Sequence, residues 1–148
     1  MKYLILILTF LLSFNFSFSQ VGIGTVTPNS TLEVNGSVAF KVVTLNGNTT
    51  TTINDGYYIN ILPNSGDQVF NLPDPSLNIG RTYILRNVVP EGQSTNAVID
   101  SFGADCVFFA NNSQGCSDSI DLRASGIQKT YVIYSDGNGW NYGPLGFE

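Results

Sequence analysis

The chain has 148 residues, 11 acidic and 6 basic, with a formal net charge of −5 and no histidine. A chain with this net negative charge lacks the clustered positive charge with which proteins bind nucleic acids. Without histidine, Ser-His-Asp and Cys-His catalytic arrangements and histidine-bearing metal centres are all excluded. The composition therefore favours a non-enzymatic protein.

Residues 1–19 have the three parts of a secretory signal peptide. Lys2 supplies the positive start, and residues 3–12 form an apolar run. Ser17 and Ser19 then place small side chains where a signal peptidase needs them. A membrane-spanning helix needs about 20 apolar residues, more than this run offers. We therefore expect cleavage after Ser19 and no membrane insertion afterwards, with the mature chain in the medium, at the cell surface or in the periplasm.

Residues 20–36 are rich in Gly, Thr and Pro, and few of their side chains are large and apolar. We interpret them as an extended arm or linker ahead of a single domain, residues 37–148. Residue 20 is glutamine, so the cysteine that a lipoprotein anchor requires is missing at the cleavage site. Loss of Lys2 leaves five basic residues against eleven acidic ones, a net charge of −6 on the mature chain.

Short strand-like segments separated by Gly, Asn, Asp and Pro fill the rest of the chain. They cover residues 37–45, 57–62, 68–72, 81–87, 97–100, 106–110, 119–122, 129–135 and 140–142, with 49–52 as an edge strand or a loop. Pro73 and Pro75 cannot donate ladder hydrogen bonds, so the chain should leave the sheet there or follow its edge. Many short strands at this spacing predict an all-β fold, a small antiparallel β-sandwich or barrel.

Two cysteines, Cys106 and Cys116, flank a turn-like segment, residues 111–115. In an oxidising compartment they can form a disulfide, which for a loop of this length contributes roughly 3 kcal/mol. Two free thiols are the alternative, since Cys106 also fits the apolar face of a strand. A zinc site is disfavoured, because two thiolates without histidine supply at most half of its ligands.

Four aspartates lie near the cysteines in the sequence: Asp100, Asp105, Asp118 and Asp121. Carboxylates suit a hard cation, so Asp118 and Asp121 are weak calcium candidates. Each aspartate also fits a turn or a solvated face, and no other cofactor is indicated. No residue is assigned a catalytic role.

Two groups of segments resemble known proteins. Residues 21–28, VGIGTVTP, and 31–38, TLEVNGSV, closely resemble a GIGT-x-x-P…L-x-V-x-G segment of tail-fibre-like and secreted bacterial surface proteins. Residues 70–75, 80–87 and 134–140 are similar to an LP…G-x-x-Y-x-I-x-N…SDG-x-x-W module of phage tail and fibre proteins. The resemblance implies a secreted or cell-surface structural and binding module, tail-fibre-head or adhesin-like. It also implies self-association, with a trimer favoured and the arm helping assembly.

A carbohydrate-binding β-sandwich is the alternative function. Exposed aromatic faces could stack on a glycan or another surface ligand, and the main candidates are Trp140, Tyr142 and Phe109. Tyr57, Tyr58 and Phe108 extend the set. The opposing interpretation is that strand aromatics form the core, so their exposure decides between the two.

Cleavage of the signal peptide can be tested by the intact mass of the protein recovered outside the cytoplasm. We expect a chain that begins at Gln20, either unmodified or cyclised to pyroglutamate. An exported chain that still carries Met1 would contradict the prediction.

Overall fold

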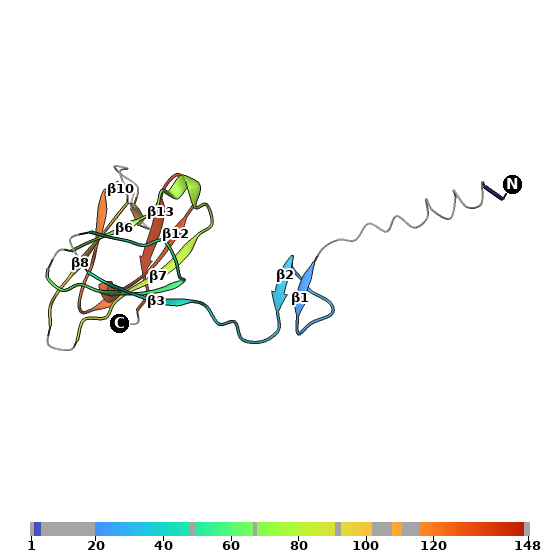
Figure 1. Ribbon diagram of the computed structural model, residues 1–148, viewed down its shortest axis with the longest axis horizontal. Helices are drawn as coiled ribbons and strands as arrows, with labels where there is room; N and C mark the ends of the chain where they lie inside the picture. Colours follow the sequence, from blue (N-terminus) through green and yellow to red (C-terminus); the bar gives the residue numbers. More distant parts are fainter. Residues whose placement is uncertain are drawn as a thin grey trace. The chain divides into compact units, whose positions relative to one another are not determined.

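The computed structural model of the chain describes residues 2–3, 20–47, 50–66, 68–90, 93–101, 108–110 and 116–146. Its contacts divide the chain into two compact units, Met1–Ala39 and Phe40–Glu148, which are described separately (Figure 1). The predicted signal peptide falls almost wholly outside the described residues and stays a prediction. In the described ranges, no helix has the length and apolar character needed to cross a bilayer.

The first unit contains a pair of short strands where a plain extended arm was expected. β1 (Val21–Ile23) pairs in parallel with β2 (Leu32–Val34). The Asn35 N–H extends the pairing by donating to the Ile23 carbonyl at 2.8 Å. Gly24, with φ 73°, begins the connecting loop in a conformation that glycine adopts readily. The segment predicted as an extended arm thus contains a strand pair, because its triplets VGI and LEV hydrogen-bond to each other.

The second unit is an all-β domain, as predicted. Its strands are β3 (Val42–Asn46), β4 (Thr50–Thr52), β5 (Tyr58–Leu62), β6 (Gln68–Leu72), β7 (Thr82–Asn87), β8 (Ala97–Ser101), β9 (Phe108–Ala110), β10 (Cys116–Ser117), β11 (Ser119–Leu122), β12 (Thr130–Ser135) and β13 (Trp140–Pro144). Two short 3-10 helices, η1 (Pro75–Leu77) and η2 (Ile127–Lys129), interrupt them. Within the described residues the strands form a seven-stranded sheet, β10-β9-β13-β12-β7-β5-β3, and a four-stranded sheet, β11-β8-β6-β4.

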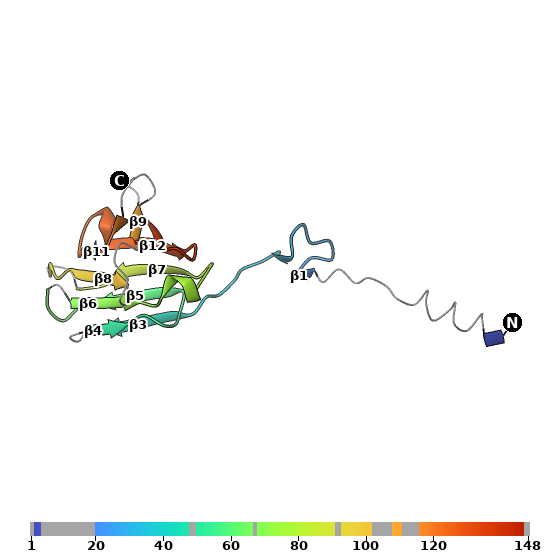
Figure 2. The same ribbon diagram turned by 90° about the horizontal axis from the view of Figure 1, so that it is seen from above.

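Consecutive strands from β3 to β8 alternate between the two sheets, so the chain coils. β5 pairs in parallel with β3 and β7, and β6 pairs in parallel with β4 and β8. In Figure 2 the pairs β3/β4, β5/β6 and β7/β8 lie one above another as successive rungs. The antiparallel prediction is wrong for this half of the domain. Its turn residues send the chain across to the opposite sheet, whereas a hairpin would return it to the neighbouring strand.

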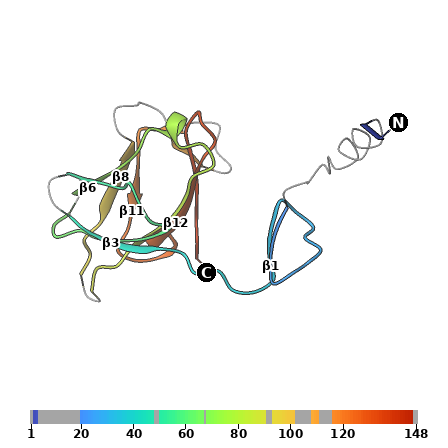
Figure 3. The same ribbon diagram turned by 45° about the vertical axis from the view of Figure 1, so that its right-hand side comes forward.

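The last strands close the coil mainly through antiparallel pairs. β12 pairs antiparallel with β7 and β13, β11 with β8, and β10 with β9, while β9 runs parallel to β13. Figure 3 shows β6, β8 and β11 together on one side of the domain, with β12 across from them. One end of the two sheets is consequently formed by β3 and β4, and the other by β10 and β11.

The core lies between the sheets and takes alternate residues from the strands of both. Its fully buried large side chains are Ile53, Ile59, Ile61, Phe70, Leu72, Tyr83, Leu85, Ile99, Phe108, Leu122, Ile133 and Trp140. Burial of each large apolar side chain contributes about 1.5–3 kcal/mol. β6 ends at Leu72 and η1 begins at Pro75, so the prediction that the chain leaves the sheet at these prolines is confirmed.

Asn87 is the polar side chain that joins several parts of this core. It is fully buried at the end of β7. Its amide nitrogen donates to the Thr95 carbonyl at 2.9 Å and the Leu122 carbonyl at 3.1 Å. Its amide oxygen accepts from the Val89 N–H at 3.1 Å. These bonds fasten the end of β7 to the approach to β8 and to the end of β11.

We expect the Asn87→Ala variant to lose about 2–4 kcal/mol of unfolding free energy, because three buried hydrogen bonds are broken at once. Urea denaturation followed by circular dichroism measures the loss. The matched control is Asn54→Ala, at an exposed position ahead of β5, which should stay within about 0.5 kcal/mol of the parent. Equal stability of the two variants would contradict the role of Asn87.

Candidate functional site

Trp140, Phe108 and Tyr142, three of the aromatic residues chosen from the sequence, do not form an exposed binding face. Trp140 is 0% exposed, and its indole N–H donates to the Pro73 carbonyl at 3.1 Å. Phe108 is buried too. Tyr142 is half-buried with its ring packed edge-on against Tyr131 and Phe108. The assignment of Trp140 to ligand binding is therefore wrong, because the phase of β13 turns this side chain into the core.

Phe109 belongs to β9, but its side chain lies outside what the structure describes, so its proposed role stays a prediction. The same holds for the predicted disulfide, because Cys106 lies outside the described residues. Cys116 begins β10 at an exposed position and is not a free cysteine. The described residues bring together no group of three acidic or thiol side chains that could hold a metal. Asp118 and Asp121 are both exposed, and Asp105 is not described.

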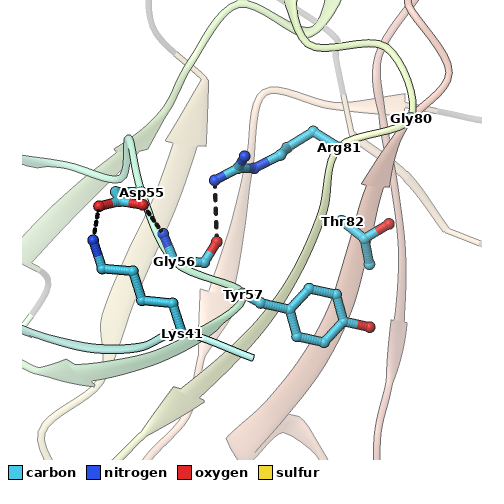
Figure 4. A pocket seen from close by; sticks show the side chains of 7 residues that line it. All are labelled: Lys41, Asp55, Gly56, Tyr57, Gly80, Arg81 and Thr82. Atoms are coloured by element: carbon cyan, nitrogen blue, oxygen red, sulfur yellow. Dashed lines mark hydrogen bonds and ion pairs between the residues drawn. The ribbon is translucent and has the colours of Figure 1, made fainter. Parts of the chain in front are cut away.

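The parallel pairing of β3, β5 and β7 instead creates a pocket that the sequence did not reveal. Because these three strands are neighbours and run in the same direction, their N-terminal ends lie side by side. An open pocket of about 390 Å³ is lined by the residues just before each strand and by the first residue of β7: Lys41, Asp55, Gly56, Tyr57, Gly80, Arg81 and Thr82 (Figure 4). Each strand of the trio thus contributes to a single site.

Backbone hydrogen bonds fix the walls of this pocket. The Tyr57 and Tyr58 N–H groups donate to the Lys41 carbonyl at 2.9 and 3.2 Å, which ties β5 to β3. Gly56 occupies the turn with φ 87°, and a Cβ there would lie 2.8 Å from side-chain atoms of Val43 and Ile59. Glycine is therefore required at this turn by both backbone conformation and space.

Three charged side chains meet at the pocket. Lys41 Nζ forms an ion pair with Asp55 Oδ2, and Asp55 Oδ1 accepts the Gly56 N–H at 2.6 Å. The hydrogen bond from Lys41 is the main cause that holds the pKa of Asp55 below its usual value, with the Gly56 N–H adding to it. Asp55 is thus ionised at neutral pH and accepts hydrogen bonds.

Arg81 spans the pocket from the β7 side. Its Nη2 donates to the Gly56 carbonyl at 3.1 Å, as Figure 4 shows. Its guanidinium carbon lies 5.0 Å from the centre of the Tyr83 ring, within the range of a cation–π contact. Its buried Nε has no hydrogen-bond partner among the described residues. The guanidinium is therefore held in place while part of its donor capacity is unused.

Exposed aromatic rings adjoin the charged groups. Phe40 stacks on Tyr57 with ring centres 4.3 Å apart and an angle of 22° between the planes. Tyr58 meets Tyr57 edge-on at 5.2 Å. Phe40 and Tyr58 are exposed, and Tyr57 is half-buried. Of the aromatic residues selected from the sequence, Tyr57 and Tyr58 thus lie beside these charged groups, together with Phe40, which was not selected.

Sequence reasoning selected Tyr57 and Tyr58 but missed Lys41, Asp55 and Arg81. The available signal was that Asp55-Gly56 and Gly80-Arg81 both stand directly before predicted strands. These residues come together in one site only because the strands that follow them are parallel neighbours. Comparison of the chain with protein-family models, with characterised proteins and with solved structures found no match.

The burial of Trp140 can be tested by fluorescence, because the chain contains a single tryptophan. We expect acrylamide to quench the folded chain far less than the urea-unfolded chain, since the indole is enclosed by the core. Equal quenching of the two states would show that Trp140 is exposed.

Proposed function

We propose that this chain is an exported, non-enzymatic structural and binding module, of the tail-fibre-head or adhesin-like kind, that works as a homotrimer. One observation carries the self-association: the β1–β2 unit leaves its apolar side chains on the surface. Val21, Ile23 and Leu32 are 49%, 56% and 60% exposed. Two short strands without a core are marginally stable in water. A partner that covers these side chains would stabilise the pair.

A second copy of the same segment is the partner that the chain itself supplies. Identical β1–β2 units present the same apolar side chains, and related by rotation they can cover one another in a closed oligomer. Three copies are proposed from the GIGT-x-x-P…L-x-V-x-G resemblance. The exposed Val26 in the connecting loop adds to the surface that association would bury.

The open end of the coil supports the same proposal. β3 and β4 are the outer strands there, and their sequences, VVTLN and TTT, contain no charged residue and no proline. Proteins commonly place charged residues or proline on edge strands to prevent pairing with another chain. Val42 on β3 is also exposed. An unprotected edge of this kind favours contact with another strand.

Export rests on the signal-peptide pattern of residues 1–19. The proposed compartments are the medium, the cell surface and the periplasm. A Cys106–Cys116 disulfide would be stable in any of them, since all three are oxidising compared with the cytoplasm. The ligand-binding part of the proposal does not rest on the residues first selected for it, because Trp140 is buried.

Self-association can be tested on the mature chain, residues 20–148, by size-exclusion chromatography with light scattering. We expect a trimer at micromolar concentration. The double variant Ile23→Thr/Leu32→Thr keeps β-forming residues but removes apolar surface, at a cost of about 1 kcal/mol for each half-exposed side chain. Its association should weaken tenfold or more.

The matched control is Val38→Thr, which changes a similarly exposed apolar residue in the segment between β2 and β3 and should leave association unchanged. A monomeric parent chain would contradict the proposal as a whole. A dimer would retain self-association but contradict the trimer, and equal association of the double variant and the parent would contradict the role of β1–β2.

A further inference from the structure

We propose that the pocket at the N-terminal ends of β3, β5 and β7 binds an acidic saccharide, a sugar ring that carries a carboxylate. This inference goes beyond assembly, because every lining residue belongs to the second unit. It also moves ligand binding from Trp140 to Lys41, Tyr57 and Arg81. Four observations carry it: the local charge, the state of the guanidinium, the carboxylate at its side and the aromatic stack.

The pocket is positive on a negative chain. Lys41 and Arg81 line it with a single acidic residue, Asp55, which gives a local balance of one positive charge. The mature chain as a whole carries eleven acidic residues against five basic ones. Two of those five basic residues thus converge on this one pocket. A concave site with a net positive charge draws negatively charged ligands, so an anionic ligand is favoured.

Arg81 is suited to the anionic group of that ligand. A guanidinium has five N–H donors in a fixed planar arrangement that matches a carboxylate. Among the described residues, the Gly56 carbonyl accepts from its Nη2; the Nε is enclosed, so the terminal nitrogens are the donors that face a ligand. The bond to Gly56 and the contact with Tyr83 hold the group in place before any ligand arrives. Such pre-organisation lowers the entropic cost of binding.

Asp55 indicates that the ligand is more than a simple anion. Its ionised carboxylate accepts hydrogen bonds and repels a second carboxylate. A ligand that fits all three charged groups therefore carries hydroxyl donors for Asp55 as well as a carboxylate for Arg81. The Thr82 hydroxyl lines the same pocket and can both donate and accept. Hydroxyl groups beside a carboxylate are what a uronic or sialic acid offers.

The aromatic residues complete the match. Tyr57 lines the pocket, with its ring backed by Phe40 at 4.3 Å, so the stack is a firm apolar surface beside the charged groups. A sugar ring presents C–H groups on its face and hydroxyls around its rim, which suits such a surface. The volume of about 390 Å³ lies within the usual range for small-molecule sites, about 300–1,000 Å³.

The test is calorimetric titration of the mature chain with three probes: trigalacturonate, a guluronate trisaccharide and sialyllactose. We expect at least one to bind, and its methyl ester, which keeps the ring but loses the charge, to bind at least about tenfold more weakly. Arg81→Gln should weaken binding by a similar factor. Arg123→Gln, the same change at an exposed position outside the pocket, is the matched control and should bind as the parent does.

Lys41→Gln provides a second variant in case Arg81→Gln is unstable, since Lys41 is exposed and its loss should also weaken binding. Thermal unfolding of each variant confirms that it is folded. The proposal is overturned if none of the three probes binds at millimolar concentration. It is equally overturned if the ester binds as well as the acid, or if a folded Arg81→Gln or Lys41→Gln chain binds as the parent does. The monomeric or trimeric state of the chain does not affect these outcomes.

Discussion

The chain from β3 to β8 changes sheet at every strand, and each strand finds its hydrogen-bond partner two strands further along. Parallel pairing is a direct result. After crossing to the opposite sheet and back, the chain re-enters the first sheet running in the same direction as the strand it left. The circuit also sets one face of every strand against the opposite sheet, which gives the buried alternation of Ile59, Ile61, Phe70 and Leu72. Among the described residues it also leaves β3 and β4 as the outermost strands at one end of the two sheets.

The same winding accounts for the position of the pocket. In an antiparallel meander, the beginnings of neighbouring strands lie at opposite ends of the sheet. In this coil the beginnings of β3, β5 and β7 lie at one end, so residues 41, 56 and 81 are neighbours although the sequence separates them widely. A lysine, an acidic turn and an arginine that are unremarkable individually become a single charged site through this geometry.

The sequence was sufficient to predict most strands of the second unit, but it predicted neither β1, β2 and β10 nor the partner of each strand. Residues 68–72 and 119–122 form β6 and β11 with the predicted bounds, because turn residues and period-two apolar patterns are local signals. Pairing order depends on contacts between distant segments, which no local pattern encodes. Trp140 and Tyr57 illustrate the same limit for the site. Both aromatics stand beside a glycine-containing turn, and only the phase of each strand against the opposite sheet decides that Trp140 is enclosed while Tyr57 reaches the pocket.

The placement of β12 between β7 and β13 has a consequence for the order of folding. Ile133 and Trp140, near the end of the chain, fill the core that the earlier rungs only enclose in part. A chain that emerges N-terminus first therefore has no closed core until its last strands are available. Folds with such distant pairings also form slowly, since the loops must close before the contacts stabilise them. A late-closing core keeps the chain unfolded for longer, which would suit the export proposed above, because a polypeptide passes through a translocation pore unfolded.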